Sequence, residues 1–407
     1  MLDLDFVRSQ FPAFSSPVLS GHAFFENAGG SYPCRQVVDR LHRFYTDRKV
    51  QPYGPYPGAQ AGGAEMDEAR ARLAAMMGVA PEAVSFGPST SANTYVLAQA
   101  VRGWLKGAGG ALVVTDQDHE ANAGVWRRLA DEGIEVREWQ VDRATGSLDP
   151  AALARLLADG KVRLLCFPHC SNVIAEINDV AAICAMARAA GARTVVDGVS
   201  YAPHGFPDFA ALGADCYLFS AYKTYGPHQG IMVLREDFGF ELPGQGHYFN
   251  HATLSKRHTP AGPDHAQIAA CAGMADYVDA LAAHHGISGD ALVRSRGVHD
   301  LMRAQEVAVI QPLLEYLAAR NDLRLLGPRD SARRAPTVAV DLGRAAEPVS
   351  EALGREGIAC WAGDFYAVRP LQALGIDLGK GVLRMSATHY TSADEVARLV
   401  AALERVL

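Results

Sequence analysis

Between residues 64 and 236 the sequence alternates helical and strand-like segments, and this alternation restricts the possible folds more than any other feature. Residues 64–78 carry apolar side chains at helical spacing, whereas residues 111–115 and 162–171 are short, mostly apolar runs typical of strands. Several of these runs are apolar on both faces, as strands are when helices cover both sides of a sheet. The pattern predicts an α/β fold built on a mainly parallel sheet.

A change of pattern near residue 241 indicates where the first domain ends. Residues 241–262 are irregular and rich in Gly, Pro and His, and long helical segments and short strands follow them. A chain of 407 residues is too long for one small core, so two domains are the default expectation. We predict an N-terminal segment, 1–20, that packs with the small domain, a large domain over 21–262, and a smaller α+β C-terminal domain over 263–407.

The composition argues against several classes of partner. The net charge is −7, the pI is near 6.1 and no long basic run occurs, which disfavours nucleic acid and anionic membranes as main partners. The first residues lack the charged and apolar regions of a signal peptide, and no window approaches about eighteen uninterrupted apolar residues. We therefore expect a cytoplasmic protein without a membrane span.

The seven cysteines are scattered through apolar segments, and an odd number suits reduced thiols better than a disulfide framework. Cys166, His169 and Cys170 lie close together in the sequence, in a grouping that could suggest zinc. No second pair at ligand spacing completes four ligands, so we expect no metal site.

Polar residues cluster just after the ends of the predicted strands, where ligands bind in open α/β sheets. Ser89 and Thr90 lie between a strand and a helix, and hydroxyls beside free N–H groups at a helix N-terminus make an anion site suited to phosphate. The alternative is that they only cap the helix. No dinucleotide or P-loop fingerprint occurs, so those modes of phosphate binding have no support.

Three further polar residues follow strands in the same way. His119 follows residues 111–115, where its ring could lie against a planar ligand, and Asn172 follows residues 162–171. Asp197 ends the apolar run "TVVD", and a carboxylate there is costly unless it meets a cation or a protonated nitrogen. Each has a structural alternative: a capping or solvated histidine, a turn residue, and a capping aspartate.

Lys223 is the most informative residue, because it lies at the junction between the apolar run "ADCYLF" and a Gly-Pro turn. An ammonium group next to a core strand is costly unless it is paired, neutral or covalently bonded, and a lysine with a lowered pKa is what Schiff-base chemistry uses. A phosphate site, a planar stacking ring, a buried acid and a lysine are together what pyridoxal 5'-phosphate (PLP) needs.

With these residues in place, the chain resembles the class V aminotransferase and cysteine desulfurase family, whose members are fold-type I PLP enzymes. The resemblance runs from "FFENAGGSYP" to "LRMSATHYTSADEV" and therefore covers nearly the whole chain. It implies a large domain with a mainly parallel, seven-stranded type of sheet and a smaller α+β domain. It also implies a small amino-acid substrate and a homodimer with active sites at the interface.

The resemblance assigns roles to individual residues. Lys223 would bind the cofactor aldehyde, Asp197 would pair with the pyridine nitrogen, and His119 would stack on the ring. Ser89, Thr90 and Ser220 would contact the phosphate. Toward the substrate, Arg384 would grip the α-carboxylate in a bidentate fork, with a surface arginine as the alternative. Asn172 would lie near the ring hydroxyl and the substrate, and Asn27 matches the substrate-side N-terminal segment.

The departures from the family pattern are equally informative. Tyr222 stands where many relatives have a histidine, and its phenol would still reach phosphate, while Ser200 replaces a glutamine or histidine near the ring oxygen. Gly262 falls where a threonine reaches the partner subunit's phosphate, so that contact is made by backbone or is absent. Tyr366 occupies the loop position at which desulfurases carry their persulfide-forming cysteine, and Cys360 lies six residues earlier.

A carboxylate-binding arginine and PLP imply an α-amino acid substrate whose α-proton Lys223 removes. Without a thiol in the loop, C–S cleavage by β-elimination is still available, because it needs only a leaving group at Cβ. We therefore expect a desulfurase-like C–S lyase. Transamination is the alternative, followed by epimerisation and by a PLP-binding protein without turnover.

Overall fold

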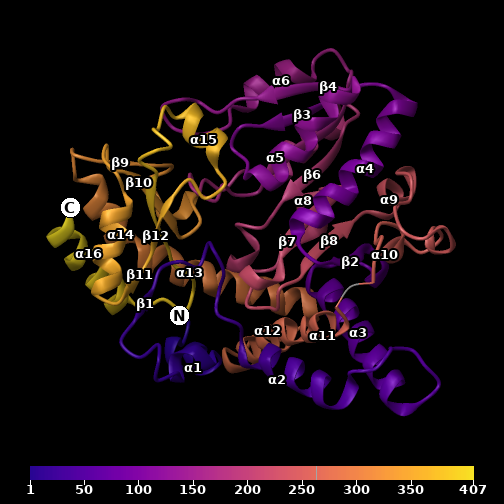
Figure 1. The fold of residues 1–407 in the computed structure, drawn as a ribbon, viewed down its shortest axis with the longest axis horizontal. Helices are drawn as coiled ribbons and strands as arrows, with labels where there is room; N and C mark the ends of the chain where they lie inside the picture. The colour runs from indigo at the N-terminus through magenta and orange to yellow at the C-terminus, as the bar shows by residue number, and fades with distance from the viewer. Residues whose placement is uncertain (263) are drawn as a thin grey trace.

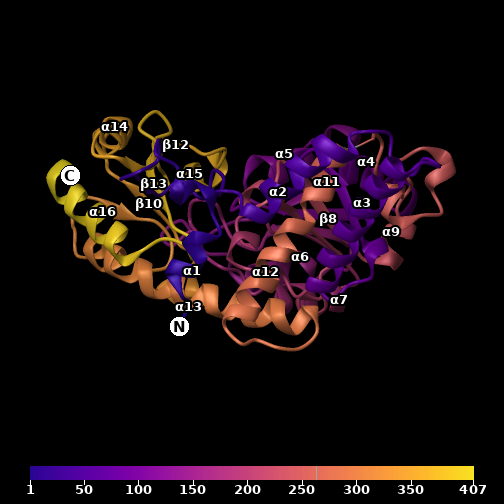
Figure 2. The same ribbon diagram turned by 90° about the horizontal axis from the view of Figure 1, so that it is seen from below.

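The computed structural model describes residues 1–262 and 264–407. A large seven-stranded sheet with its helices forms one part of the molecule, and a small four-stranded sheet with its helices forms the other (Figures 1 and 2). The division that we predict between residues 262 and 263 involves Pro263, which lies outside the described residues, so the domain limits stay a prediction.

The large sheet confirms the predicted α/β class. Only one strand, β8, runs antiparallel to its neighbours, and every other neighbouring pair is parallel. The order across the sheet is β2 (Val84–Gly87), β8 (Gly230–Leu234), β7 (Cys216–Ser220), β6 (Arg193–Asp197), β5 (Val162–Pro168), β3 (Ala111–Thr115) and β4 (Glu135–Trp139).

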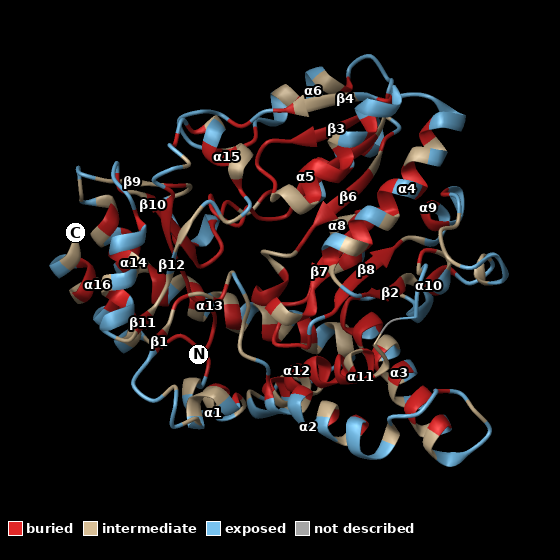
Figure 3. Ribbon diagram, in the orientation of Figure 1, coloured by how far each residue is buried: buried red, intermediate tan, exposed pale blue. Residues whose placement is uncertain are grey.

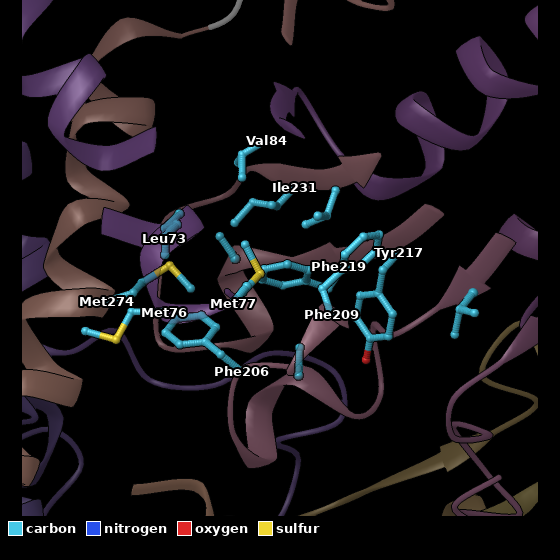
Figure 4. Packing of buried hydrophobic residues seen from close by; sticks show 14 of the residues in the cluster. Leu73, Met76, Met77, Val84, Phe206, Phe209, Tyr217, Phe219, Ile231 and Met274 are labelled. Atoms are coloured by element: carbon cyan, nitrogen blue, oxygen red, sulfur yellow. The ribbon is translucent and has the colours of Figure 1, made fainter. Parts of the chain in front are cut away.

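Both faces of this sheet are covered, as the apolar runs predict. Successive residues of β7 enter different cores, because side chains alternate across a strand. Tyr217 and Phe219 pack with Leu73 of α3 (Pro57–Met76) on one face (Figure 4). Leu218 packs on the other face with residues of α4 (Thr90–Ala108) and α5 (Glu120–Arg127). The central strands are consequently buried along their length (Figure 3).

Shorter helices complete this part of the molecule. Two of them, α11 and α12, follow the irregular segment and pack against α2 and α3 rather than against the small sheet. The bounds are α2 (Arg35–Arg43), α6 (Pro150–Leu157), α7 (Val180–Ala189), α8 (Phe209–Leu212), α9 (Glu236–Glu241), α10 (Leu254–Arg257), α11 (His265–Ala270) and α12 (Ala272–His284).

The small sheet is antiparallel and forms its own core with the C-terminal helices. A separate pair of short strands, β1 (Ala23–Phe24) and β11 (Ile358–Ala359), joins the N-terminal region to it in parallel. The other elements are β12 (Trp361–Gly363), β13 (Val382–Ser386), β10 (Thr337–Asp341), β9 (Arg324–Leu325), α14 (Glu347–Arg355), α15 (Val368–Ala373) and α16 (Ala393–Val406).

One long helix, α13 (Ala291–Ala318), joins the two cores, since Met302 packs in the first core and Leu313 in the second. The N-terminal helix α1 (Leu4–Ser9) also contacts both parts. Arg8 forms a 2.8 Å salt bridge with Glu395 of α16, while Val7 packs in the core of the large sheet. Among the described residues, no helix is long and apolar enough to cross a membrane.

Candidate active site

A cavity of about 320 Å³ opens at the C-terminal ends of the parallel strands. It brings together residues from five strand ends that are far apart in the sequence. Nine of the residues that the sequence singles out line it: Ser89, Thr90, His119, Asn172, Asp197, Ser200, Ser220, Tyr222 and Lys223.

Lys223 lies in the short 3-10 turn that follows β7, and its side chain is buried beside the cavity. Burial, together with the nearby positive charge of Arg384, lowers the pKa of its ammonium group to about 8, although the charges of Asp197 and Glu26 act in the opposite direction. A substantial fraction of the side chain is therefore the neutral amine at mildly alkaline pH. This is the protonation state that a nucleophile or a base requires.

Asp197 ends β6 and accepts a 2.8 Å hydrogen bond on Oδ1 from the N–H group of Val199. Burial raises the pKa of its carboxyl group to about 6. The carboxylate forms no salt bridge with any described residue, although it is buried and faces the cavity. It is placed to pair with a protonated nitrogen of a ligand.

His119 caps the N-terminus of α5, and its Nδ1 atom accepts a 3.1 Å hydrogen bond from the N–H group of Ala121. That bond leaves Nε2 as the protonated nitrogen of the neutral ring. Burial, with the charges of Lys223 and Arg384, lowers the pKa of the imidazole to about 3. The ring is thus flat and uncharged at neutral pH, which suits stacking on a planar ligand.

The N-terminus of α4 forms the end of the cavity that suits phosphate. Ser89 caps this helix, and Thr90 Oγ1 lies 2.7 Å from Ser220 Oγ, so hydroxyls from two strand ends meet beside free helix N–H groups. A side chain at position 230 would lie 2.5 Å from the carbonyl oxygen of Ser89, so Gly230 permits the close approach of β8. Tyr222 stacks on His228 at the rim, with ring centroids 4.9 Å apart.

Asn172 links the cavity to the small sheet. Its Nδ2 atom donates a 2.9 Å hydrogen bond to the carbonyl oxygen of Phe365, but its Oδ1 atom is buried without a partner among the described residues. A buried acceptor without a donor is unfavourable. The Oδ1 atom is therefore available for a ligand hydroxyl or ammonium group.

Arg384 extends from β13 toward the same region and is buried. Its Nη2 atom donates to Glu26 Oε1 over 2.6 Å, and its guanidinium lies 3.8 Å from the centre of the Phe365 ring. The Nε atom of Arg384 and the Oε2 atom of Glu26 are buried without partners among the described residues. Arg384 is thus positioned for an anion but is already paired with one carboxylate oxygen of Glu26.

A tight turn, Asp364–Ala367, covers this arginine. Phe365 and Tyr366 have φ values of 54° and 55°, a left-handed conformation that non-glycine residues adopt at an energetic cost. The turn is fixed at both sides, since Asp364 Oδ1 accepts from the N–H group of Tyr366, and the carbonyl oxygen of Tyr366 accepts from the N–H group of Glu120. The side chain of Tyr366 is exposed, with its ring centroid 5.5 Å from that of His119.

Comparison of the sequence with known proteins identifies its family. The sequence model of "Aminotransferase class-V" matches residues 23–399. The chain belongs to the class V aminotransferase family. Two relatives are an aminotransferase-like protein of Gibberella zeae, 32% identical over 98% of both chains, and a cysteine desulfurase of Pectobacterium atrosepticum, 30% identical over 98% of this chain and 97% of that one.

The fold is also that of solved desulfurases. The apo structure of a cysteine desulfurase from Thermococcus onnurineus superposes with a TM-score of 0.84 at 21% identity, covering 100% of this chain and 98% of the other. The predicted fold-type I architecture is confirmed, with its mainly parallel seven-stranded sheet and a separate antiparallel sheet.

Class V aminotransferases and cysteine desulfurases are PLP-dependent enzymes, and the residues of this cavity fit that cofactor. Lys223 is buried with a lowered pKa, Asp197 is a buried acid that forms no salt bridge with the described residues, and Asn172 has an oxygen without a partner among them. The neutral ring of His119 and the N-terminus of α4 supply a stacking surface and an anion site. The individual roles of these residues remain predictions.

Asn27 differs from the other predicted class V site residues, because its side chain is occupied within the protein. Its Nδ2 atom donates to the carbonyl oxygens of Ser386 and Phe24, at 2.8 and 3.2 Å, and its Oδ1 atom accepts from the hydroxyl of Tyr390. The residue also lines a small cavity beside Lys223. These contacts join the N-terminal segment to β13, and substrate binding by Asn27 stays a prediction.

Two acidic residues were missed by sequence reasoning. Glu26 pairs with Arg384, and Asp118 lines the cofactor cavity, buried, with an unpartnered Oδ1 atom. Burial and the charge of Asp197 raise the pKa of Asp118 well above its usual range, which favours the protonated acid. The signal was present in both cases, because each acid directly precedes a residue that the sequence did single out, Asn27 and His119.

The cysteines show no arrangement for metal binding. Among residues 1–262 and 264–407, no group of three or more His, Cys, Asp or Glu side chains could hold a metal ion. All seven cysteines are free thiols. Cys360 lies between β11 and β12, and burial, together with the charge of Glu26, raises the pKa of its thiol to about 12.

Proposed function

We propose that this protein is a PLP-dependent C–S lyase that acts on a cysteine-derived α-amino acid by β-elimination. The observation that carries the proposal is the turn over Arg384, which presents Phe365 and Tyr366 and no thiol. Cys360 is a poor substitute, since its pKa is raised to about 12 and the thiolate is the nucleophilic form. Transfer of sulfur to the protein needs that nucleophile, whereas β-elimination does not.

The substrate would be oriented by its α-carboxylate. Arg384 offers a guanidinium whose Nε atom lacks a partner among the described residues, and Phe365 holds the guanidinium plane from one side. Asn172 Oδ1 is available to accept a hydrogen bond from the substrate or the cofactor. These contacts would direct the Cα–H bond toward Lys223 and the side chain toward the Tyr366 side of the cavity.

Lys223 would hold the cofactor and move the α-proton, because its buried amine has a pKa near 8. Bound PLP supplies an electron sink that stabilises the negative charge left when the Cα–H bond breaks. Asp197 and the neutral ring of His119 would fix the plane of the cofactor. With one water, the overall reaction converts a cysteine conjugate into a thiol, pyruvate and ammonium.

Transamination is the second candidate, and one observation favours it. The relative from Gibberella zeae, 32% identical to this chain, is named an aminotransferase-like protein. The same arginine would then have to bind the carboxylates of both an amino acid and a keto acid. Epimerisation and PLP binding without turnover are further alternatives that the same experiment separates.

We also propose a cytoplasmic homodimer with active sites at the interface. Large apolar side chains support an interface, since Tyr53, Tyr248 and Phe249 are 58%, 85% and 69% exposed. The cavity near them contains Gly262, the position expected to face the partner's phosphate. Analytical ultracentrifugation of the holoenzyme tests the dimer, and a monomer at micromolar concentration would contradict it.

The deciding experiment supplies the PLP-loaded protein with cysteine, cysteine sulfinate and S-substituted cysteines and measures the products. Pyruvate in amounts equal to the released thiol supports β-elimination. Alanine indicates desulfuration, product that depends on an added keto acid indicates transamination, and a change of chirality alone indicates epimerisation. Absence of turnover with all of them, despite absorbance of a bound cofactor that borohydride bleaches, would indicate a binding protein.

A further inference from the structure

A second cavity, of about 460 Å³, lies where the small sheet meets the loop that follows β4. Its most unusual property is its charge: Arg320, Arg324, Arg329 and Arg333 line it, and none of its described lining residues is acidic. The chain as a whole carries a net charge of −7, so this concentration of cations runs against the average of the molecule. We call it the arginine cavity.

The positive charge of the arginine cavity is only partly neutralised by the protein. Arg320 pairs with Asp322, and Arg333 lies 3.5 Å from Glu176 with its side chain 67% exposed. Arg324 and Arg329 form no salt bridge with any residue of the described ranges 1–262 and 264–407. Cations gathered in one concave site raise the local positive potential, which attracts anions.

Arg324 is held in place by backbone oxygens rather than by an acid. Its Nη1 atom donates to the carbonyl oxygen of Leu374 over 2.7 Å, and its Nη2 atom donates to the carbonyl oxygens of Arg143 and Ala144, both over 3.1 Å. These bonds fix the guanidinium while leaving its charge uncompensated. A fixed guanidinium is well suited to bind phosphate oxygens.

We propose that the arginine cavity is a binding site for a small phosphorylated anion, separate from the cofactor site. Its volume is within the range of roughly 300–1,000 Å³ that small-molecule sites occupy. Its charge calls for a ligand with more than one negative group. None of its lining residues lines the cofactor cavity.

Two segments of the chain connect the arginine cavity to the active site. On one side, Leu374 directly follows α15, and α15 begins just after the turn that covers Arg384. On the other side, the carbonyl oxygen of Gly146 accepts from Gln117 Nε2 over 2.9 Å, and Gln117 adjoins Asp118. A ligand in the arginine cavity therefore ties the loop after β4 to the segment that carries the covering turn.

Calorimetry with inorganic pyrophosphate tests the proposal on the PLP-saturated holoenzyme, in chloride buffer without phosphate. We expect one saturable site per chain. Arg329→Ala should weaken binding by about tenfold, the effect of losing a hydrogen bond to a charged group. Because Arg329 is exposed and forms no salt bridge with the described residues, this variant should fold normally. Arg355→Ala removes an equal charge from exposed α14 and should leave affinity unchanged.

Three results would overturn the proposal. Pyrophosphate that fails to bind, or that binds equally weakly to the Arg329→Ala and Arg355→Ala proteins, would show that the cavity has no specific affinity. Binding that occurs only after removal of PLP would place the anion at the N-terminus of α4 instead.

Discussion

At one end of the active-site cavity, Lys223 and Asp197 are buried and form no salt bridge with any described residue, whereas at the other end Arg384 is paired with Glu26 over 2.6 Å. Burial shifts the pKa of Lys223 down and that of Asp197 up, so each is pushed toward its neutral form. Burial also lowers the pKa of Arg384, but Glu26 opposes that shift. One end of the cavity therefore favours neutral side chains, whereas the other end keeps a charged pair.

This difference indicates which ligand groups each end of the cavity could bind. The cofactor end, with Lys223 and Asp197, has an amine, an acid and helix N–H groups that bound PLP would satisfy in the proposed arrangement. The carboxylate end already contains a carboxylate, and it uses only one of that carboxylate's oxygens. A substrate carboxylate bound by Arg384, as we propose, would therefore compete with Glu26 or share the guanidinium with it. Substitutions at the two ends should consequently have different kinetic signatures.

Replacing the lysine should have the largest effect. Lys223→Ala should reduce turnover by about 1,000-fold or more, because in the proposed mechanism this one side chain holds the cofactor and moves the proton. Treatment with borohydride should no longer attach the cofactor covalently to the protein. Lys161→Ala, at an exposed lysine, is the control and should behave like the unchanged protein. Pyruvate release or amino-group exchange by Lys223→Ala would refute the catalytic assignment.

Substitution at the carboxylate end should affect substrate binding instead. Arg384→Lys keeps a positive charge but loses the planar fork, so kcat/KM for an amino acid should fall by about 100-fold, mainly through KM. Steady-state kinetics over a range of substrate concentrations, with the cofactor spectrum as a check on loading, measures this. A fall in kcat at unchanged KM would instead show that Arg384 acts in the chemical step rather than in substrate binding.

Asp197→Asn should change the stability of the apoprotein in a way that depends on pH. In the apoprotein the buried carboxylate lowers the free energy of unfolding as pH rises from about 3.8 to about 6, and the cost is fully present above pH 6. Asn removes that charge, so the apo variant should be more stable at pH 7.5 by on the order of 2–3 kcal/mol and should lose the advantage near pH 3.5. Urea unfolding at both pH values tests this, and equal stability at pH 7.5 would show that the carboxylate is well compensated.

How much of this site the sequence could predict follows from the same contrast. The alternation of apolar runs predicts the parallel sheet, and the strand ends then predict that His119, Asp197 and Lys223 converge, because all parallel strands end at one edge. The cofactor end of the site is thus built from residues at the strand ends of one sheet. The domain boundary is less predictable, since α11 and α12 follow the irregular segment yet pack against α2 and α3.

The carboxylate end depends on contacts across long sequence separations, and patterns along the chain do not show them. Glu26 meets Arg384 only because β1 pairs with β11 and Glu26 itself forms a bridge to Ser386 of β13. Likewise, the aromatic face of Phe365 lies over Arg384 only because of the left-handed turn. A single sequence identifies Arg384 by resemblance but gives no sign that an internal acid occupies it.

Glu26→Gln should therefore have the smallest effect and the most specific one. If Glu26 competes with the substrate, a neutral amide should lower KM for α-amino acids by about threefold to tenfold, because a charged competitor is replaced by a weaker hydrogen-bond partner. The change in kcat should be small, since Glu26 does not line the cofactor cavity and its charge affects the pKa of Lys223 less than burial does. Glu82→Gln, at an exposed glutamate without a salt bridge to the described residues, is the matched control. An increase in KM would show that Glu26 positions Arg384 for the substrate rather than competing with it, and the two ends of the cavity would then be prepared in the same way.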